Sequence, residues 1–217
     1  MADPAISPPM APHGAEGAQN AAVAPTSLTF RPPSTSPAYQ ASKPSTSFAV
    51  PPPSFLSGPW HVTHSTLPMW KSNRNVVITY TYLTDGATQD QTPNDDLQID
   101  DLVTYAPNNN PSKQKTVKGI DTPDPNVPAA WNWRGKGWLK IASSHWEVIG
   151  WGEEDGGWVV TYFAKTLFTP AGIDIYARRK GGLSEKLLES IKAAMRGVED
   201  DAFREQAGKI FQIEHDW

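Results

Sequence analysis

The stretch Leu56-Ser57-Gly58-Pro59-Trp60 divides the chain into two parts of different character. Residues 1–57 hold twelve of the 21 prolines and none of the nine tryptophans. The part that follows is rich in aromatic residues and in short runs that alternate between apolar and polar residues. The Gly-x-Trp inside this stretch therefore marks the start of the part that can fold and carry chemistry.

The first 57 residues are expected to be a solvated arm. They include only four charged residues: Asp3, Glu16, Arg31 and Lys43. The Ala, Ser and Thr between the prolines offer little apolar area to offset the entropy lost when a chain becomes ordered. We therefore predict a disordered Pro/Ala/Ser-rich N-terminal arm over residues 1–57 and one folded domain over residues 58–217.

Composition excludes several classes of protein. The charges of the arm cancel, so the net charge of −4 falls on the domain and argues against a nucleic-acid partner. The absence of cysteine removes disulfides, thiolate zinc sites and cysteine nucleophiles. No apolar run is long enough for a secretory signal or a membrane span, so we expect a cytoplasmic protein, with a transit peptide in the arm as the alternative. We expect no metal and no other cofactor, because no suitable ligand set occurs.

Eight runs with a period of two residues, separated by turn residues, predict β-strands. They are Trp60–Leu67, Asn75–Leu83, Gln98–Ala106, Gln114–Ile120, Trp131–Ile141, His145–Trp151, Trp158–Ala164 and Ile173–Arg179. A helical pattern follows from Ser184 to Gly197, and a second, more polar helix is expected over Asp200–Ile210. The first helix has an apolar stripe made of Leu187, Leu188, Ile191 and Met195.

The short connections favour an antiparallel meander. A twisted meander of eight strands most often closes on itself, because closure removes its unpaired edges. We therefore predict an all-β fold, an eight-stranded antiparallel up-and-down β-barrel with a C-terminal α-helix packed on the outside. The alternative is a two-sheet sandwich, which needs long crossover connections that this chain lacks.

Three segments make the chain resemble the lipocalin family of the calycin superfamily. Ser57-Gly58-Pro59-Trp60 is similar to the family's entry into its first strand, and Ile175-Tyr176-Ala177-Arg178 is similar to the end of its eighth strand. The order strand, acidic turn, strand, strand and helix over His145–Met195 is similar to the C-terminal half of the family. The resemblance covers residues 56–196.

This resemblance implies a pocket for a hydrophobic ligand inside the barrel, although some calycins are cyclases or isomerases. It also implies how the barrel is closed at one end: Gly58 and Trp60 enter the first strand, and Arg178 lies over the indole of Trp60.

The last three strands have two faces, and the pattern leaves open which face is inside. One face is almost wholly apolar: Trp146, Val148, Gly150, Trp158, Val160, Tyr162, Ile173, Ile175 and Ala177. The other face carries polar and charged groups: His145, Glu147, Ile149, Trp151, Val159, Thr161, Phe163, Asp174, Tyr176 and Arg178. An apolar face usually points inward. However, the predicted helix needs an apolar partner, so we favour the second face as the inner one.

With this orientation, counting from a Trp60–Arg178 pair places His64 beside Asp174 inside the barrel. We hypothesise that these two residues form an acid-base pair and that Tyr80 supplies a further catalytic hydrogen bond. The alternative is that His64 and Asp174 form a purely structural pair, or that one of them faces solvent. The expected ligand-binding residues are Val62, Ile78, Tyr82, Trp133, His145, Glu147, Thr161, Phe163 and Tyr176. Surface pairing is the alternative for His145 and Glu147.

Two functions follow from these features. The first is an intracellular barrel that binds a hydrophobic small organic molecule of polyketide, terpenoid or aromatic size. The second is a cofactor-independent cyclase or isomerase that acts on such a metabolite through His64 and Asp174. A loss of turnover with ligand affinity retained in His64→Ala and Asp174→Asn would distinguish the enzyme from the binding protein.

Overall fold

A computed structural model describes residues 28–42, 48–83, 97–167 and 169–217. The strands are β1 (Gly58–Ser65), β2 (Asn73–Tyr82), β3 (Ile99–Pro107), β4 (Lys115–Pro123), β5 (Ala130–Gly135), β6 (Ser143–Gly152), β7 (Trp158–Phe163), β8 (Gly172–Ala177) and β9 (Phe211–Gln212). The helices are α1 (Pro37–Ser42), α2 (Pro53–Leu56), α3 (Glu185–Arg196) and α4 (Asp201–Ala207), with 3-10 turns η1 (Pro68–Ser72), η2 (Gly137–Leu139) and η3 (Glu154–Gly156).

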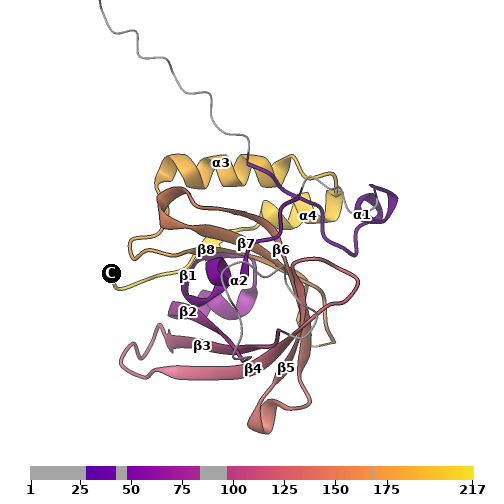
Figure 1. The fold of residues 1–217 in the computed structure, drawn as a ribbon. Coiled ribbons are helices and arrows are strands. Elements are labelled where there is room, and N and C mark those ends of the chain that lie inside the picture. The colour runs from indigo at the N-terminus through magenta and orange to yellow at the C-terminus, as the bar shows by residue number, and fades with distance from the viewer. Residues whose placement is uncertain (1–27, 43–47, 84–96, 168) are drawn as a thin grey trace, which may run out of the picture.

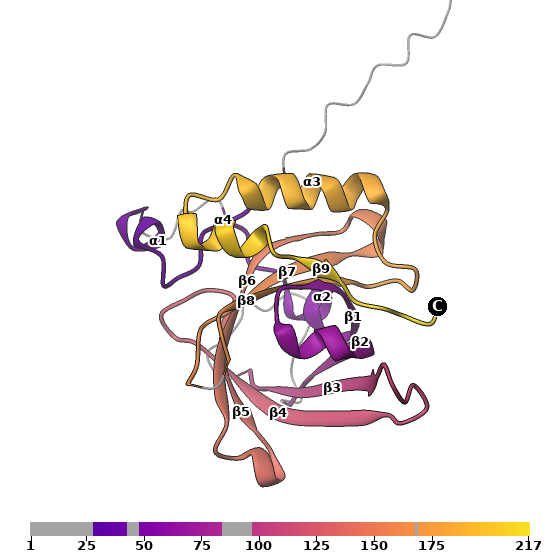
Figure 2. The same cartoon turned by 180° about the vertical axis from the view of Figure 1, so that it is seen from behind.

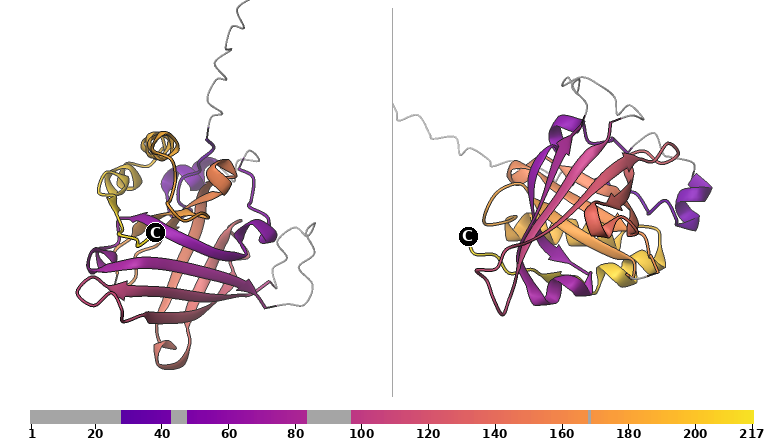
Figure 3. Two further views of the ribbon diagram at one scale, coloured as in Figure 1. Left: turned by 90° about the vertical axis from the view of Figure 1, so that its left-hand side faces the viewer. Right: turned by 90° about the horizontal axis from the view of Figure 1, so that it is seen from below.

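Strands β1 to β8 form one closed antiparallel barrel (Figures 1 and 3). Each strand pairs with the next along the chain, and β1 pairs with both β2 and β8, which closes the ring. The short β9 adds to the ring by pairing with β1. The predicted up-and-down barrel is therefore confirmed, and the sandwich alternative is wrong. The main difference in strand limits is β5, which ends at Gly135 because Gly137, with φ +63°, turns the chain into η2.

Trp60 and Arg178 close one end of the barrel, as predicted. The guanidinium carbon of Arg178 lies 3.5 Å from the centroid of the Trp60 ring. Arg178 also donates hydrogen bonds to the backbone carbonyl oxygens of Pro59, at 2.9 Å, and of Phe55. Gly58 has φ +93°, a conformation that residues with a side chain rarely adopt, and this explains the glycine of the Gly-x-Trp.

Helices α3 and α4 lie against the outside of the barrel near β6, β7 and β8 (Figures 1 and 2). Ser184 caps α3 and Gly197 ends it, as predicted, whereas α4 is shorter than the predicted second helix. The apolar layer between helices and strands is called the outer core: Ile149, Trp158, Val160, Ile173, Ile175, Ile191, Met195, Val198, Phe203 and Ala207. No helix in the described part of the chain is long and apolar enough to cross a membrane.

Strands β7 and β8 have the orientation favoured from the sequence. Val160 and Ile175 pack in the outer core, whereas Val159 and Tyr176 pack inside the barrel. The apolar stripe of α3 therefore does find its partner on the outer face of the barrel wall.

Strand β6 differs from the prediction because its register with β7 shifts between Val148 and Gly150. Such a β-bulge adds a residue to one strand and changes which side chains face inward. Trp146 and Val148 therefore pack inside the barrel, although the predicted alternation puts them outside, and Ile149 joins the outer core.

Part of the predicted arm packs on the barrel. Phe30 forms a β-bridge with Gly150, and its ring lies 2.6 Å from the position that a Cβ atom on this glycine would take. Arg31 and Glu147 form an ion pair at 2.6 Å that is shielded from solvent. The prediction of a solvated arm is therefore wrong for these residues. On the outer face of β6, Gly150 leaves room for the ring of Phe30, and Glu147 is the charged partner of Arg31.

The C-terminal end of the arm is also packed. Leu56 at the end of α2 is buried, and Phe48, Val50 and Phe55 pack against the core of the barrel. The folded unit therefore includes the described residues 28–42 and 48–57, and residues 1–27 and 43–47 lie outside the described part.

Candidate ligand-binding site

The interior of the barrel is lined mainly by aromatic and apolar side chains. It contains most of the residues predicted to bind a ligand: Val62, Ile78, Tyr82, Trp133, Thr161, Phe163 and Tyr176. Val62, Ile78 and Tyr176 are buried, whereas Tyr82, Trp133 and Phe163 keep part of their surface exposed. Of these partly exposed side chains, Tyr82 lines a hollow at the end of the interior that is described below.

Three rings stack across the interior. Tyr80 on β2 and Trp146 on β6 lie with ring centroids 5.3 Å apart and planes at 8°. Trp131 on β5 continues the stack at 4.5 Å from Trp146, with planes at 20°. Tyr80 is therefore inside, as predicted, but its ring forms one end of an aromatic stack, and burial raises the pKa of its hydroxyl well above the usual value.

The predicted pairing of His64 with Asp174 does not form. Val62 lies opposite Tyr176 as expected, but the register shifts after it, so that His64 lies opposite Ile175 and Ser65 lies opposite Asp174. This β-bulge sends the imidazole to the outside, where Lys192 and Glu189 of α3 influence its charge. Burial lowers the pKa of His64 to about 4. The geometric premise of the predicted acid-base pair is therefore wrong.

Asp174 itself lies inside the barrel, and Ser65 takes the place expected for His64. The Ser65 hydroxyl donates to Asp174 Oδ1 at 2.5 Å and accepts a hydrogen bond from the backbone N–H of Leu67 at 2.8 Å. Burial raises the pKa of Asp174 to about 7, and interactions with Ser65 and Trp70 oppose this shift. Asp174 can therefore hold a proton near neutral pH.

Glu147 and His145 lie on the outside of the barrel, because the alternation of β6 before its bulge places Trp146 inside. Glu147 is buried under the arm, where it accepts hydrogen bonds from Arg31 and from both the backbone N–H and the hydroxyl of Ser34. The prediction that Glu147 and His145 line the interior is therefore wrong, and the residues of the arm explain the burial of Glu147.

Two neighbouring carboxyl groups inside the barrel were not predicted from the sequence. Asp101 on β3 pairs in register with Gly119, and Asp121 on β4 pairs with Ile99, so the two aspartates are diagonal neighbours on the inner face. Burial raises the pKa of Asp101 to about 7 and that of Asp121 well above its usual value, with Asp101 adding to the shift of Asp121. We call Asp101 and Asp121 the inner carboxyl pair.

Each member of the pair has one oxygen without a partner. The indole N–H of Trp146 donates to Asp121 Oδ1 at 2.8 Å. Asp121 Oδ2 and Asp101 Oδ1 are buried and accept no hydrogen bond from the residues that the structure describes. Within the same residues, no ion pair includes Asp101, Asp121 or Asp174. The interior therefore holds acids without a cation.

Gly119 allows Trp133 to lie over β4 and to reach this pair. A Cβ atom on Gly119 would lie only 1.9 Å from the indole nitrogen of Trp133. The same indole interacts with Asp101 and opposes the rise of its pKa. The position of Asp101 could have been predicted, because it alternates in phase with Ile99 and Val103 on the inner face. Asp121 could not, because it lies beyond the predicted end of its strand.

A hollow of about 300 Å³ lies at one end of the interior. We call it the rim hollow, and it is lined by Val50, Pro51, Pro53, Tyr82, Leu97 and residues 123–131. Its inner side is formed by Tyr82 and by Trp131, the last ring of the stack. Its outer side is made by the arm and by the β4–β5 connection, whose Pro128 carbonyl accepts a hydrogen bond from Arg31 at 3.2 Å. The packed arm thus completes this hollow.

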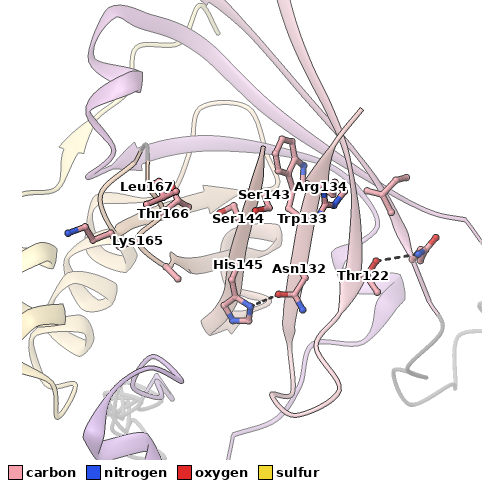
Figure 4. A pocket seen from close by; sticks show the side chains of 13 residues that line it. Thr122, Asn132, Trp133, Arg134, Ser143, Ser144, His145, Lys165, Thr166 and Leu167 are labelled. Atoms are coloured by element: carbon pink, nitrogen blue, oxygen red, sulfur yellow. Dashed lines mark hydrogen bonds between the residues drawn. The ribbon is translucent and has the colours of Figure 1, made fainter. Parts of the chain in front are cut away.

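A larger hollow of about 960 Å³ lies on the outside of the barrel (Figure 4). We call it the outer hollow, and its wall includes Thr122, Asn132, His145 and Leu167. His145 Nδ1 lies 3.1 Å from Asn132 Oδ1, and this contact holds the ring along the sheet. It is more open to solvent than the rim hollow, where a hydrophobic molecule would lose more contact with water.

Solved structures with the same fold are of the lipocalin type. Lobster apocrustacyanin A1 is 10% identical, has a TM-score of 0.54 and is matched over 89% of this chain and 93% of its own. Insecticyanin from the tobacco hornworm Manduca sexta is 11% identical, has a TM-score of 0.54 and is matched over 75% of this chain and 80% of its own. Together with the closed barrel, the Trp60–Arg178 contact and the external helix, these similarities show that the chain has a lipocalin-like fold, as the resemblance implies.

A similarity in sequence points to a particular relative. Botcinic acid biosynthesis cluster B protein 12 of Botryotinia fuckeliana (strain B05.10) is 29% identical over 151 residues. The match covers 66% of this chain and 66% of that protein. No protein-family model matches the chain.

Proposed function

We propose that this protein binds a hydrophobic small organic molecule of polyketide, terpenoid or aromatic size in its barrel. The observation that carries this proposal is the stack of Tyr80, Trp146 and Trp131, which ends in the wall of the rim hollow. A planar apolar ligand in the hollow would extend the stack over the free side of Trp131, an arrangement that aromatic rings favour. The hollow of about 300 Å³ is within the size range of small-molecule sites.

The similarity to a protein of a biosynthesis cluster supports a role connected with a metabolite. The name of that relative refers to botcinic acid biosynthesis, and the matched region is extensive. For this chain we propose a metabolite of the same broad kind, apolar in most of its surface and bearing some oxygen atoms.

Native mass spectrometry and titration of tryptophan fluorescence with a panel of apolar and oxygenated ligands test this proposal. We expect a one-to-one complex and a change in emission, because Trp131 lies in the wall of the hollow. Val127→Trp should fill the rim hollow and abolish binding, whereas Thr122→Trp, a matched change in the outer hollow, should leave binding intact. The proposal fails if the panel does not bind, or if Thr122→Trp blocks binding and Val127→Trp does not.

A cofactor-independent cyclase or isomerase is the second candidate. It is favoured by Asp174 and the inner carboxyl pair, since burial keeps these acids protonated near neutral pH and so able to act as general acids. Mass spectrometry of metabolites from a host that lacks the gene separates the two functions. A cyclase or isomerase predicts that a precursor of the same mass as the lost product accumulates, whereas a binding protein predicts that no such isomer appears.

A further inference from the structure

Two unpartnered oxygens in the interior call for a ligand group. Asp121 Oδ2 and Asp101 Oδ1 are shielded from water and accept no hydrogen bond from the described residues. A buried polar atom without a partner destabilises the folded state, so such atoms are rare unless something outside the chain completes them. Asp101 is 7% exposed and Asp121 is 0% exposed, so bulk water does not meet this need.

The two carboxyl groups lie near each other inside the barrel with no described charge partner. They are diagonal neighbours on the same inner face, and no described cation pairs with either one. Two like charges confined in an apolar interior repel each other and lose their hydration, and a proton on each group removes both costs. A protonated carboxyl group is a hydrogen-bond donor as well as an acceptor.

The pair is also close to the proposed site. Tyr82 lines the rim hollow and pairs in register with Ile99 of β3. On its other side, Ile99 pairs with Asp121 of β4. Tyr82 and Asp121 therefore flank the same residue of the inner wall, and the charge of Asp121 contributes to the raised pKa of Tyr82. From the other side, Trp146 joins the pair to the aromatic stack through its hydrogen bond to Asp121.

We propose that Asp101 and Asp121 are both held as neutral acids and that the unpartnered Oδ1 of Asp101 donates its proton in a hydrogen bond to a carbonyl oxygen of the ligand. This inference rests on the proposed function and adds the chemical class of the ligand, an apolar molecule with a ketone, ester or lactone carbonyl. A neutral acid suits a neutral acceptor, because the complex then buries no net charge. An amine ligand, which is cationic near neutral pH, would instead need one carboxyl group to be ionised.

Three probes of nearly equal shape test the inference: 2-acetylnaphthalene, 2-ethylnaphthalene and 1-(2-naphthyl)ethylamine. The wild-type protein should bind the ketone about three- to tenfold more tightly than the hydrocarbon, the effect of one net hydrogen bond. Asp101→Leu should remove this preference, whereas Asp101→Asn, which retains an N–H donor, should keep it. Asp100→Asn removes a carboxyl group from the same strand at a position paired with Lys136 on the surface, and it should bind like the wild type.

A tighter complex with the amine, or equal affinity for ketone and hydrocarbon in the wild type, would overturn the inference but leave the proposed function in place. Infrared spectroscopy provides a measurement that does not depend on the variants folding. The carbonyl stretch of bound ketone should move to lower frequency, and a band from a protonated carboxyl group should be present at about pH 6. If no probe binds, the proposed function fails, and the absence of that carboxyl band would overturn the protonated state of the pair independently.

Discussion

The barrel wall buries carboxyl groups on both of its faces, and within the described part of the chain only the outer one is paired with a cation. Glu147 on the outside is paired with Arg31 at 2.6 Å and is also hydrogen-bonded by Ser34. Asp121 on the inside is equally buried, yet among the described residues it has one indole donor and one oxygen without a partner. The outer carboxyl group fastens one part of the chain to another, whereas the inner one lacks the partner that a purely structural role would provide.

The difference extends to the packing around these groups. The outside carries the outer core, a continuous apolar layer between the sheet and α3 and α4. The inside mixes aromatic rings with Asp101, Asp121 and Asp174, all with a raised pKa. The outer layer is thus apolar throughout, whereas the interior retains groups that lower stability, which is typical of sites kept for function.

Removing the outer cation should have the largest effect. Arg31→Met leaves Glu147 buried without its charge partner, and we expect a loss of about 3–5 kcal/mol in the free energy of unfolding. Urea denaturation measures this loss, and Glu147→Gln in the same chain should restore much of it. A loss below about 1 kcal/mol, as for a surface pair, would show that the arm contributes little to the fold.

The outer core should be the next most sensitive region. Ile175→Ala opens a cavity between β8 and α3, and we expect a loss of about 3 kcal/mol. Ile141→Ala is the control, since Ile141 is 89% exposed and should change stability by less than about 0.5 kcal/mol. Equal effects of the two substitutions, measured by urea denaturation, would contradict the role given to the outer core.

Asp174, adjacent to Ile175 but on the inner face, should respond in the opposite direction. Its pKa is raised to about 7 in the folded protein, so the folded state binds more protons than the unfolded chain between about pH 4 and pH 7, and stability falls as the pH rises through this range. Asp174→Asn should therefore increase the free energy of unfolding at pH 8 by an amount on the order of 1 kcal/mol, and by less at pH 5. The increase should be seen as a higher melting temperature. Thermal melts across this pH range measure the effect, with Ile175→Ala as a control whose loss of stability should not depend on pH. A gain of stability in Asp174→Asn that is the same at every pH would contradict the assignment.

His64 should give the smallest effect and the opposite pH dependence. Its pKa is lowered to about 4 by burial, so the unfolded chain takes up a proton at a higher pH than the folded protein does, and His64 lowers stability as the pH falls from about 6.5 to 4. His64→Gln should remove this part of the acid sensitivity with little change at pH 8. Chemical shifts of the imidazole protons followed by NMR give the pKa directly, and a value near 6.5 would contradict the burial of His64 beside α3.

The barrel itself could be predicted from local pattern. Gly58 and Trp60, the alternation of the eight runs and the apolar stripe around Ile191 each act over a few residues, and each indicated the same architecture. The limits of α3 also followed from a local rule, because Ser184 and Gly197 are residues that favour helix ends. Agreement among such local signals is the reason that the fold was predicted correctly.

The interior could be predicted only in part, because face assignment depends on unbroken counting. One shift in β1 moved His64 to the outside, and one in β6 exchanged Trp146 with Glu147. A bulge depends on pairing with another strand, so the residue pattern of one strand does not predict it. The packing of the arm was missed for a similar reason, since Arg31 has its partner 116 residues away in the chain.

The two bulges also govern how this chain should be aligned with distant relatives. Each adds one residue on the outside of the barrel while the residues on either side continue to face inward, as Val62 and Ser65 do in β1. A relative can therefore lose or gain a residue at these points and keep the same inner wall. An alignment without gaps through β1 or β6 would then compare inner residues with outer ones, so ancestry is better traced by placing insertions and deletions at the bulges and matching inward positions alone.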